Sequence, residues 1–255
     1  MSNSTFALVV WIMMLALGCN NSDQVSGPGD QSQEIVNRAI SAMGGEILDR
    51  ALITFDFRDQ SLSYYNDGGQ FRYTRTFPDT AGNVITDTLT NEDFIRYRNG
   101  EKLDLSEEQK SSLKGGVNSI IYFAFLPYKL NDPGVRKEYL GSVAIAGKTY
   151  EKVKVDFPEN EETNTYNDIY FYYFDPEDYS LDYLSYEFEE DGGGIRFRSA
   201  YNARKIDGLI VQDYINYMAV PDSVDYARIE TYFDQGLLRE LSRIELKNIK
   251  IYPLN

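Results

Sequence analysis

The sequence has 255 residues, no histidine and one cysteine, with 40 acidic and 25 basic side chains and a formal net charge of −15. The missing imidazoles exclude Ser-His-Asp and Cys-His nucleophile systems and the usual histidine ligands of catalytic zinc. The negative charge opposes phosphate backbones, so no nucleic-acid partner is expected, and a single thiol excludes an internal disulfide.

The N-terminal segment is an apolar run over residues 6–17, followed by Gly18 and Cys19. It is shorter than the ~20 residues of a membrane-spanning helix. The small residues before Cys19 resemble a bacterial lipobox, so we expect residues 1–18 to be a lipoprotein signal peptide and Cys19 to carry lipid such as palmitate. No Lys or Arg precedes the run, and Ala16 stands where a lipobox most often has Leu. An uncleaved anchor or a simple secretory signal is therefore the alternative.

The next segment changes from polar to amphipathic. Residues 19–33 are small and polar, which is typical of a flexible tether. Residues 34–43 carry an apolar stripe at helical spacing and end at Gly44, so they predict a helix that opens the domain.

The chain then alternates apolar and polar residues at a period of two, which predicts antiparallel strands joined by short turns. Asn66 to Gly69 is a hairpin turn signal. Residues 106–125 predict a helix that is apolar on nearly every side toward its end and must therefore be covered. Six further strands, a helix over residues 226–238 and a last strand over residues 239–252 complete the chain. The whole pattern predicts a mainly β fold with a few helices, in which about eleven strands form a strongly curved antiparallel sheet or open half-barrel wrapped around helices.

This order of elements resembles the superfamily of periplasmic lipoprotein carriers and outer-membrane lipoprotein receptors. That resemblance implies an open barrel whose concave apolar face is covered by helices. Several short segments of the sequence are similar to those of an uncharacterised family of lipoproteins common in Bacteroidota. The similar stretches are LTNEDF at 89–94, IIYFAFLPYKLNDP at 120–133, DGGGIRFR at 191–198 and DYINY at 213–217. The resemblance carries no catalytic motif, and it implies a single carrier-like domain over residues 34–255.

Aromatic strand residues and the apolar helix are the candidate ligand site, because together they either fill the fold or line a pocket for an acyl chain. Arg75 falls on the aromatic face between Tyr73 and Phe77, where it needs a partner, so it is our candidate for the polar end of a ligand. The complete set of expected ligand-binding residues is Phe55, Phe57, Phe71, Tyr73, Arg75, Ile121 and Phe125.

Two other groups of charged residues have a functional and a structural interpretation. Arg96 with Arg98, and Arg196 with Arg198, each lie on one strand face and can grip a phosphate or carboxylate, but cross-strand ion pairs are the simpler explanation. Acidic clusters such as residues 187–191 can suggest a carboxylate hydrolase or a calcium site, but such runs are usually solvated loops. No metal, cofactor or catalytic residue is expected.

The sequence thus favours a non-enzymatic exported lipoprotein of the cell envelope that binds an acyl chain or another elongated apolar ligand. Its membrane and leaflet, its oligomeric state and the ligand's identity stay open. The alternative is a lipoprotein with a filled core that acts as a protein- or glycan-interaction module.

Overall fold

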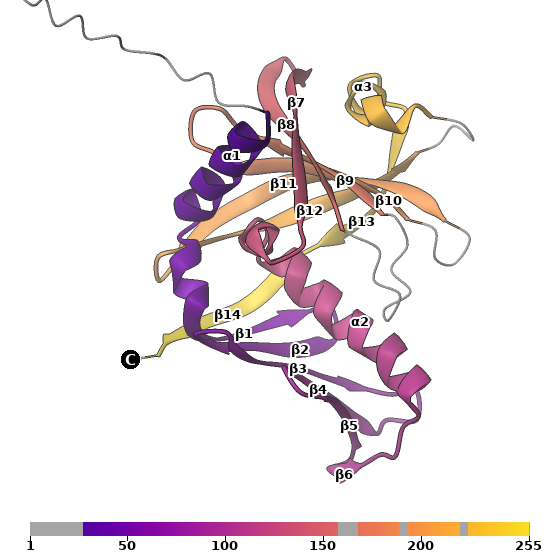
Figure 1. Cartoon of the computed structure of the whole chain (residues 1–255). Coiled ribbons are helices and arrows are strands. Elements are labelled where there is room, and N and C mark those ends of the chain that lie inside the picture. The colour runs from indigo at the N-terminus through magenta and orange to yellow at the C-terminus, as the bar shows by residue number, and fades with distance from the viewer. Residues whose placement is uncertain (1–27, 158–167, 189–192, 220–223, 255) are drawn as a thin grey trace, which may run out of the picture.

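The computed structural model describes residues 28–157, 168–188, 193–219 and 224–254. Its strands form two seven-stranded antiparallel sheets (Figure 1). In spatial order, the first sheet contains β14 (Leu246–Pro253), β1 (Arg50–Phe57), β2 (Gln60–Asp67), β3 (Gln70–Pro78), β4 (Val84–Thr90), β5 (Phe94–Arg98) and β6 (Glu101–Lys102). The second sheet contains β13 (Leu238–Ile244), β12 (Leu209–Ala219), β11 (Gly194–Ile206), β10 (Leu181–Phe188), β9 (Ile169–Phe174), β8 (Lys148–Asp156) and β7 (Arg136–Ile145).

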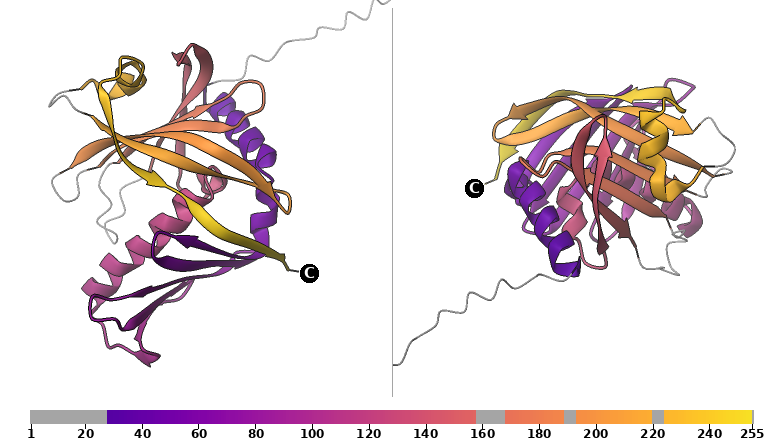
Figure 2. Two further views of the ribbon diagram at one scale, coloured as in Figure 1. Left: turned by 180° about the vertical axis from the view of Figure 1, so that it is seen from behind. Right: turned by 90° about the horizontal axis from the view of Figure 1, so that it is seen from above.

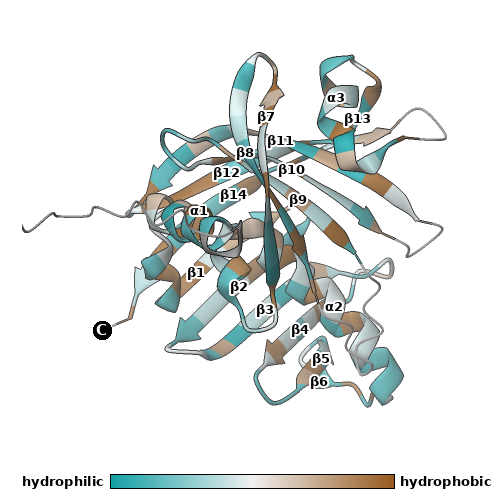
Figure 3. Ribbon diagram, turned by 45° about the horizontal axis from the view of Figure 1, so that its top comes forward, coloured by the Kyte–Doolittle hydropathy of each residue, from teal (hydrophilic) through white to brown (hydrophobic). Residues whose placement is uncertain are grey.

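The first sheet is buried on one face, as its alternating sequence predicts. Along β1, Ala51, Ile53 and Phe55 are buried and alternate with more exposed residues. The predicted hairpin is confirmed, because Gly68 and Gly69 join β2 to β3 with φ angles of 60° and 95°, which suit a two-residue hairpin turn. Figure 3 shows the alternation as bands of brown and teal along several strands.

Two of the helices pack against the sheets. α1 (Pro28–Ala42) packs Ile35, Val36 and Ala39 onto the second sheet. It begins at Pro28 rather than at residue 34, because proline is tolerated in the first helical turn. The predicted helix over residues 106–125 is confirmed as α2 (Glu107–Ala124), which starts with a capping box between Ser106 and Gln109.

The third helix is shorter than predicted. The segment expected to be helical over residues 226–238 forms a 3₁₀ turn (Tyr226–Arg228) and α3 (Ile229–Asp234), which packs on the outer face of the second sheet. The helix stops because Gly236 adopts a φ of 69°, after which Leu238 already belongs to β13. Two further 3₁₀ turns span Gly45–Asp49 and Tyr128–Asn131.

The last strand was wrongly predicted as one element. It is divided into β13, which pairs with β12 in the second sheet, and β14, which pairs with β1 in the first. At the break, the Leu246 backbone N–H donates to Asp213 Oδ1 at 3.0 Å, and Arg204 donates to the Leu246 carbonyl. Side chains thus replace the neighbouring strand as hydrogen-bond partners, and the chain passes from one sheet to the other there (Figure 2).

The mainly β class with a few helices is confirmed, but the expected single, strongly curved sheet of about eleven strands is wrong. Over the described residues there are two sheets of seven strands, and neither is closed or strongly curled. The break at Leu246 is the physical reason, because it divides what alternation alone presents as one continuous ladder. The signal segment and Cys19 lie outside the described residues.

Candidate functional site: two cavities between the sheets and the helices

Two cavities lie where the helices meet the second sheet. The first, which we call the α1 cavity, has a volume of about 220 Å³. It is lined by Ala39, Ala42, Met43, Ala124, Leu126, Pro127, Asp178, Tyr179, Ser180, Leu181, Ile210, Val211, Gln212 and Tyr214. The second, which we call the α2 cavity, has a volume of about 250 Å³. It is lined by Phe57, Ser119, Ile120, Phe123, Ala124, Tyr186, Arg198, Gln212, Tyr214, Ile244 and Leu246.

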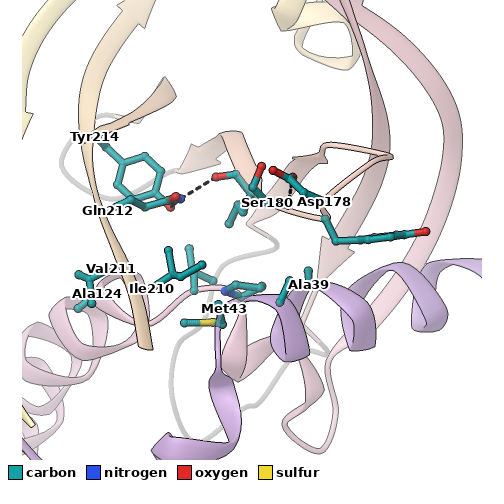
Figure 4. Close-up of a pocket in the computed structure, with 14 residues that line it drawn as sticks. Ala39, Met43, Ala124, Asp178, Ser180, Ile210, Val211, Gln212 and Tyr214 are labelled. Atoms are coloured by element: carbon teal, nitrogen blue, oxygen red, sulfur yellow. Dashed lines mark hydrogen bonds between the residues drawn. The ribbon is translucent and has the colours of Figure 1, made fainter. Parts of the chain in front are cut away.

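The two cavities share a wall made by Ala124, Gln212 and Tyr214. Gln212 Nε2 donates to the Leu181 carbonyl and to the Tyr214 hydroxyl, both at 2.6 Å, and these bonds fix the amide in the lining that the cavities share. Figure 4 shows Gln212 and Tyr214 in the lining of the α1 cavity. Burial raises the pKa of Tyr214 to about 12, so its hydroxyl stays neutral at physiological pH. The wall is therefore polar but uncharged.

One face of helix α2 packs on the first sheet and another borders the α2 cavity. Val117 and Ile121 are buried against the first sheet, whereas Ile120, Phe123 and Ala124 are partly buried and border the α2 cavity. This explains why the end of the helix is apolar all round: one side packs in a core and the other faces a cavity. The sequence left open whether this helix fills the core or lines a pocket, and α2 does both with different faces.

Arg198 is the charged residue of the α2 cavity. It lies on β11 and is only 7 % exposed. Its Nη2 donates to the Tyr186 hydroxyl at 3.0 Å, and its guanidinium carbon lies 4.2 Å from the centre of the Phe123 ring. Its Nε has no hydrogen-bond partner in the described part of the chain. Arg198 therefore lines the cavity with a guanidinium that still has a buried donor without an acceptor.

The residues expected to bind a ligand are brought together, but mainly as a packed core. Phe55, Tyr73, Ile121 and Phe125 are at most 2 % exposed, and Phe57 and Phe71 pack against the same cluster. Phe55 meets Phe125 edge-on with ring centres 5.7 Å apart, and Phe71 stacks on Tyr73 at 4.6 Å. Of the seven expected residues, Phe57 alone also lines the α2 cavity.

The guanidinium group of Arg75 is bound by a carboxylate of the same protein. Its Nη2 lies 2.6 Å from Oδ2 of Asp87, a carboxylate that is fully buried and also binds Arg96. The guanidinium lies under α2 at Gly116, where an added Cβ would be 3.3 Å from Arg75 Nη1. The partner that the sequence required for Arg75 is therefore Asp87, and Arg75 lines neither of the two cavities.

The other buried charges are paired. The buried carboxylates of the described residues each meet a cation: Asp87 with Arg75, Asp175 with Lys148, Asp213 with Arg204, and Glu230 with Lys152. Within the described ranges no group of three or more His, Cys, Asp or Glu side chains can hold a metal ion. Likewise, none of the helices described here is both long and apolar enough to cross a membrane.

Sequence reasoning considered Arg198 but could not separate it from the other arginines, and it missed Gln212 and Tyr214. Arg96 does form the ion pair expected of it, at 2.6 Å from Asp87, and Arg98 lies 3.8 Å from Asp79. The alternating pattern places Arg198 on a strand face correctly. Whether an acid faces it depends on tertiary contacts, which the pattern does not contain.

Comparison with known proteins identifies a family and a fold. Residues 18–245 match the model of a family of unknown function, DUF6503. The chain belongs to this family. The comparison with curated proteins finds no match.

Among solved structures, the chain is similar to a LolA superfamily protein from Nitrosomonas europaea, with 12 % identity, a TM-score of 0.52, and coverage of 88 % of this chain and 94 % of that one. A putative outer membrane lipoprotein-sorting protein domain from Vibrio parahaemolyticus aligns at 9 % identity over 88 % of this chain and 93 % of that one, with a TM-score of 0.46. The lipoprotein LppX from Mycobacterium tuberculosis aligns at 9 % identity over 63 % and 89 %, with a TM-score of 0.31. At these identities the likeness concerns the fold, and the first of the three supports a LolA-like arrangement.

Proposed function

We propose that this DUF6503 protein is a non-enzymatic, exported lipoprotein that binds an acyl chain or another elongated apolar ligand in the α1 and α2 cavities. The observation that carries the proposal is that two adjacent cavities share the lining residues Ala124, Gln212 and Tyr214. Each cavity alone is below the ~300 Å³ typical of ligand pockets, and the two together exceed it. A ligand long enough to occupy both would pass beside Ala124.

The lining supports an apolar ligand. Methyl, methylene and ring surfaces from α1, the residue after it, α2 and β12 border the cavities, including Met43, Ile120, Phe123 and Ile210. Burying an acyl chain against such surfaces yields ~0.8 kcal/mol per CH₂ group. Phe57 is retained as a direct ligand contact, and the other apolar residues expected from the sequence support the cavity from the core behind it.

The likeness to a LolA superfamily fold supports the same proposal, because the resemblance to lipoprotein carriers implies an apolar face covered by helices. The lipobox-like segment before Cys19 supports attachment of the protein to a membrane of the cell envelope through lipid on that thiol. Ligand binding and anchoring are separate parts of the proposal and are tested separately.

The test of ligand binding uses the exported Cys19→Ser protein, which keeps the full chain but has no acylation site. Bound lipids are identified by mass spectrometry of organic extracts, and binding is measured with a fluorescent fatty acid. Ala124→Trp places a large ring in the shared wall and should abolish binding. Ala81→Trp, at an exposed position in the turn between β3 and β4, is the matched control and should bind normally.

A correctly folded protein that carries no lipid and binds no fatty acid would contradict the proposal. Equal binding by Ala124→Trp and wild type would remove the cavities as the site. In the first case the protein- or glycan-interaction module becomes the preferred function. Thermal unfolding of both tryptophan variants shows whether loss of binding is a loss of folding.

A further inference from the structure

The described part of the protein neutralises its buried charges with one exception. Two basic residues are buried there, Lys152 at 3 % exposure and Arg198 at 7 %. Lys152 Nζ lies 2.9 Å from Glu230 Oε2 and also donates to the Ala227 carbonyl. Arg198 forms no ion pair within the described ranges, although the chain carries 40 acidic residues.

The surroundings of Arg198 stabilise its positive charge but do not supply acceptors for all of its N–H donors. The guanidinium carbon is 4.2 Å from the centre of the Phe123 ring and 5.2 Å from that of Tyr186, distances at which aromatic faces attract a cation. Tyr186 also accepts a hydrogen bond from Nη2. These contacts leave Nε without an acceptor, and a buried donor without an acceptor is unfavourable. Because Arg198 also lines the α2 cavity, its guanidinium group is placed to meet an acceptor bound there.

The chemistry of an arginine favours an anion as that acceptor. A guanidinium presents its N–H donors in a planar fork that matches two oxygens of a carboxylate or phosphate. The rest of the α2 cavity supplies apolar surface from Ile120, Phe123, Ile244 and Leu246. One cation beside apolar surface fits a ligand that has one anionic group and a hydrocarbon chain.

We propose that the ligand is an amphipathic anion, whose carboxylate or phosphate group binds Arg198 in the α2 cavity while its hydrocarbon chain lies along the apolar lining. This inference rests on the proposed function and specifies the ligand's chemical class. It assigns the polar end of the ligand to Arg198 rather than to Arg75, whose guanidinium is bound by Asp87.

The experiment measures binding of three hexadecyl probes that differ in their polar end. Palmitate and hexadecyl phosphate carry the two candidate anions, and methyl palmitate is the neutral control. Each probe displaces an uncharged fluorescent lipid from the full-chain Cys19→Ser protein. Wild type should bind at least one anion about tenfold tighter than the ester, as expected for loss of a charge-assisted hydrogen bond. Comparison of the two anions distinguishes carboxylate from phosphate recognition.

Variants locate the recognition at one side chain. Arg198→Met should remove the tenfold preference and leave ester binding within about twofold, since about 1.4 kcal/mol corresponds to one factor of ten. Arg198→Lys keeps the charge and should keep part of the preference. Arg196→Met is the matched control two residues earlier on β11, where the side chain stacks on Phe188 and lines neither cavity, and it should keep the full preference.

The outcomes separate this inference from the proposed function. If wild type binds the ester as tightly as both anions, the anion site is refuted while an apolar cavity stands. If Arg198→Met weakens all probes equally, Arg198 has a structural role only and the inference is refuted. If no probe binds to folded wild type, the proposed function fails together with it. Should Arg198→Met not fold, the wild-type selectivity and the Arg198→Lys variant decide.

Discussion

The carboxylate of Asp87 holds three adjacent strands of the first sheet together, and its removal is a direct test of the core beneath α2. Asp87 on β4 is fully buried and pairs across the sheet with Arg75 on β3 and Arg96 on β5. The two guanidinium groups donate to it at distances that include 2.6 Å from Arg75 Nη2 and 2.6 Å from Arg96 Nε. Their side chains are only 13 % and 18 % exposed.

Asp87→Asn preserves the shape of the side chain but removes its charge. Two poorly solvated cations then lose their counter-charge, and breaking a buried pair in this way costs ~3–5 kcal/mol. Urea unfolding at pH 7, followed by circular dichroism, should show this as a lower midpoint at an unchanged slope. Asp67→Asn is the control on β2. Its partner Arg50 and Asp67 itself are 54 % and 42 % exposed, so the loss there is about 0–1 kcal/mol.

A similar loss for Asp87→Asn and Asp67→Asn would refute the argument that burial makes the Asp87 network important. Arg75→Met tests the network from the other side. It leaves Asp87 paired with Arg96, so it should destabilise the fold less than Asp87→Asn does. It should also leave the preference for anionic ligands intact, because Arg75 lies outside both cavities.

Three further predictions concern the anchor, alkaline pH and backbone packing. Cys19→Ser should abolish metabolic labelling with a fatty-acid analogue, and equal labelling of wild type and variant would contradict the lipoprotein assignment. Burial raises the pKa of Tyr214 to about 12, whereas an unfolded chain ionises its tyrosines near 10. The stability from this group is present below pH 10 and is lost as the pH rises toward 12, so Tyr214→Phe should reduce the fall of unfolding free energy in that window by up to about 1.4 kcal/mol per pH unit. Urea titrations at pH 9 and 11 measure this, and an unchanged slope would count against it. Gly44→Ala should destabilise more than Gly82→Ala. Both glycines have φ near 80°, but a Cβ at Gly44 would lie 2.4 Å from the Gly208 carbonyl oxygen, whereas Gly82 has open space around it. Thermal unfolding compares them, with ~1–2 kcal/mol expected for the φ strain alone at Gly82.

The parts of the fold that depend on local chemistry were predictable. The segment over residues 84–89 corresponds to β4, and Asp207-Gly208 forms the expected turn with φ angles of 45° and 100°. The helix start at Ser106 follows from a capping box that is legible in the sequence. In each case the preference of a few neighbouring residues decides the backbone conformation.

The division into two sheets was not predictable from the same evidence. Apolar and polar residues alternate along a strand in the same way whichever sheet it joins. Residues 239–252 therefore have the sequence pattern of one continuous strand. The break depends on Asp213 and Arg204, which lie on the β12 and β11 hairpin and bind the backbone of Leu246. That arrangement requires contacts between residues more than thirty positions apart. The alternation of apolar and polar residues within one segment contains no information about such contacts.

The same distinction explains why Arg75 forms a buried ion pair whereas the proposed ligand contact is Arg198. Both are arginines among aromatic residues on strands, but alternation placed only Arg75 on the aromatic face and left Arg198 on a face shared with Arg196. What decides their chemistry is the residue opposite. For Arg75 it is Asp87 on the next strand, with which it forms a closed ion pair. Arg198 has Leu184 and Asn216 as its cross-strand neighbours.

Neither neighbour of Arg198 carries a charge, so among the described residues the guanidinium contacts two aromatic faces and donates to one hydroxyl. The break at Leu246 contributes to this environment, because Leu246 and Ile244 on either side of it line the α2 cavity together with Phe57 of the first sheet. Where the two sheets part, α2 covers the gap with Ile120 and Phe123 but brings no acid toward Arg198. For Arg75 the carboxylate comes from the adjacent strand of the same sheet, because Asp87 on β4 lies directly across from it. The parting of the sheets thus accounts for the cavity, and the uncharged neighbours on β10 and β12 account for a cation that has no ion pair among the described residues.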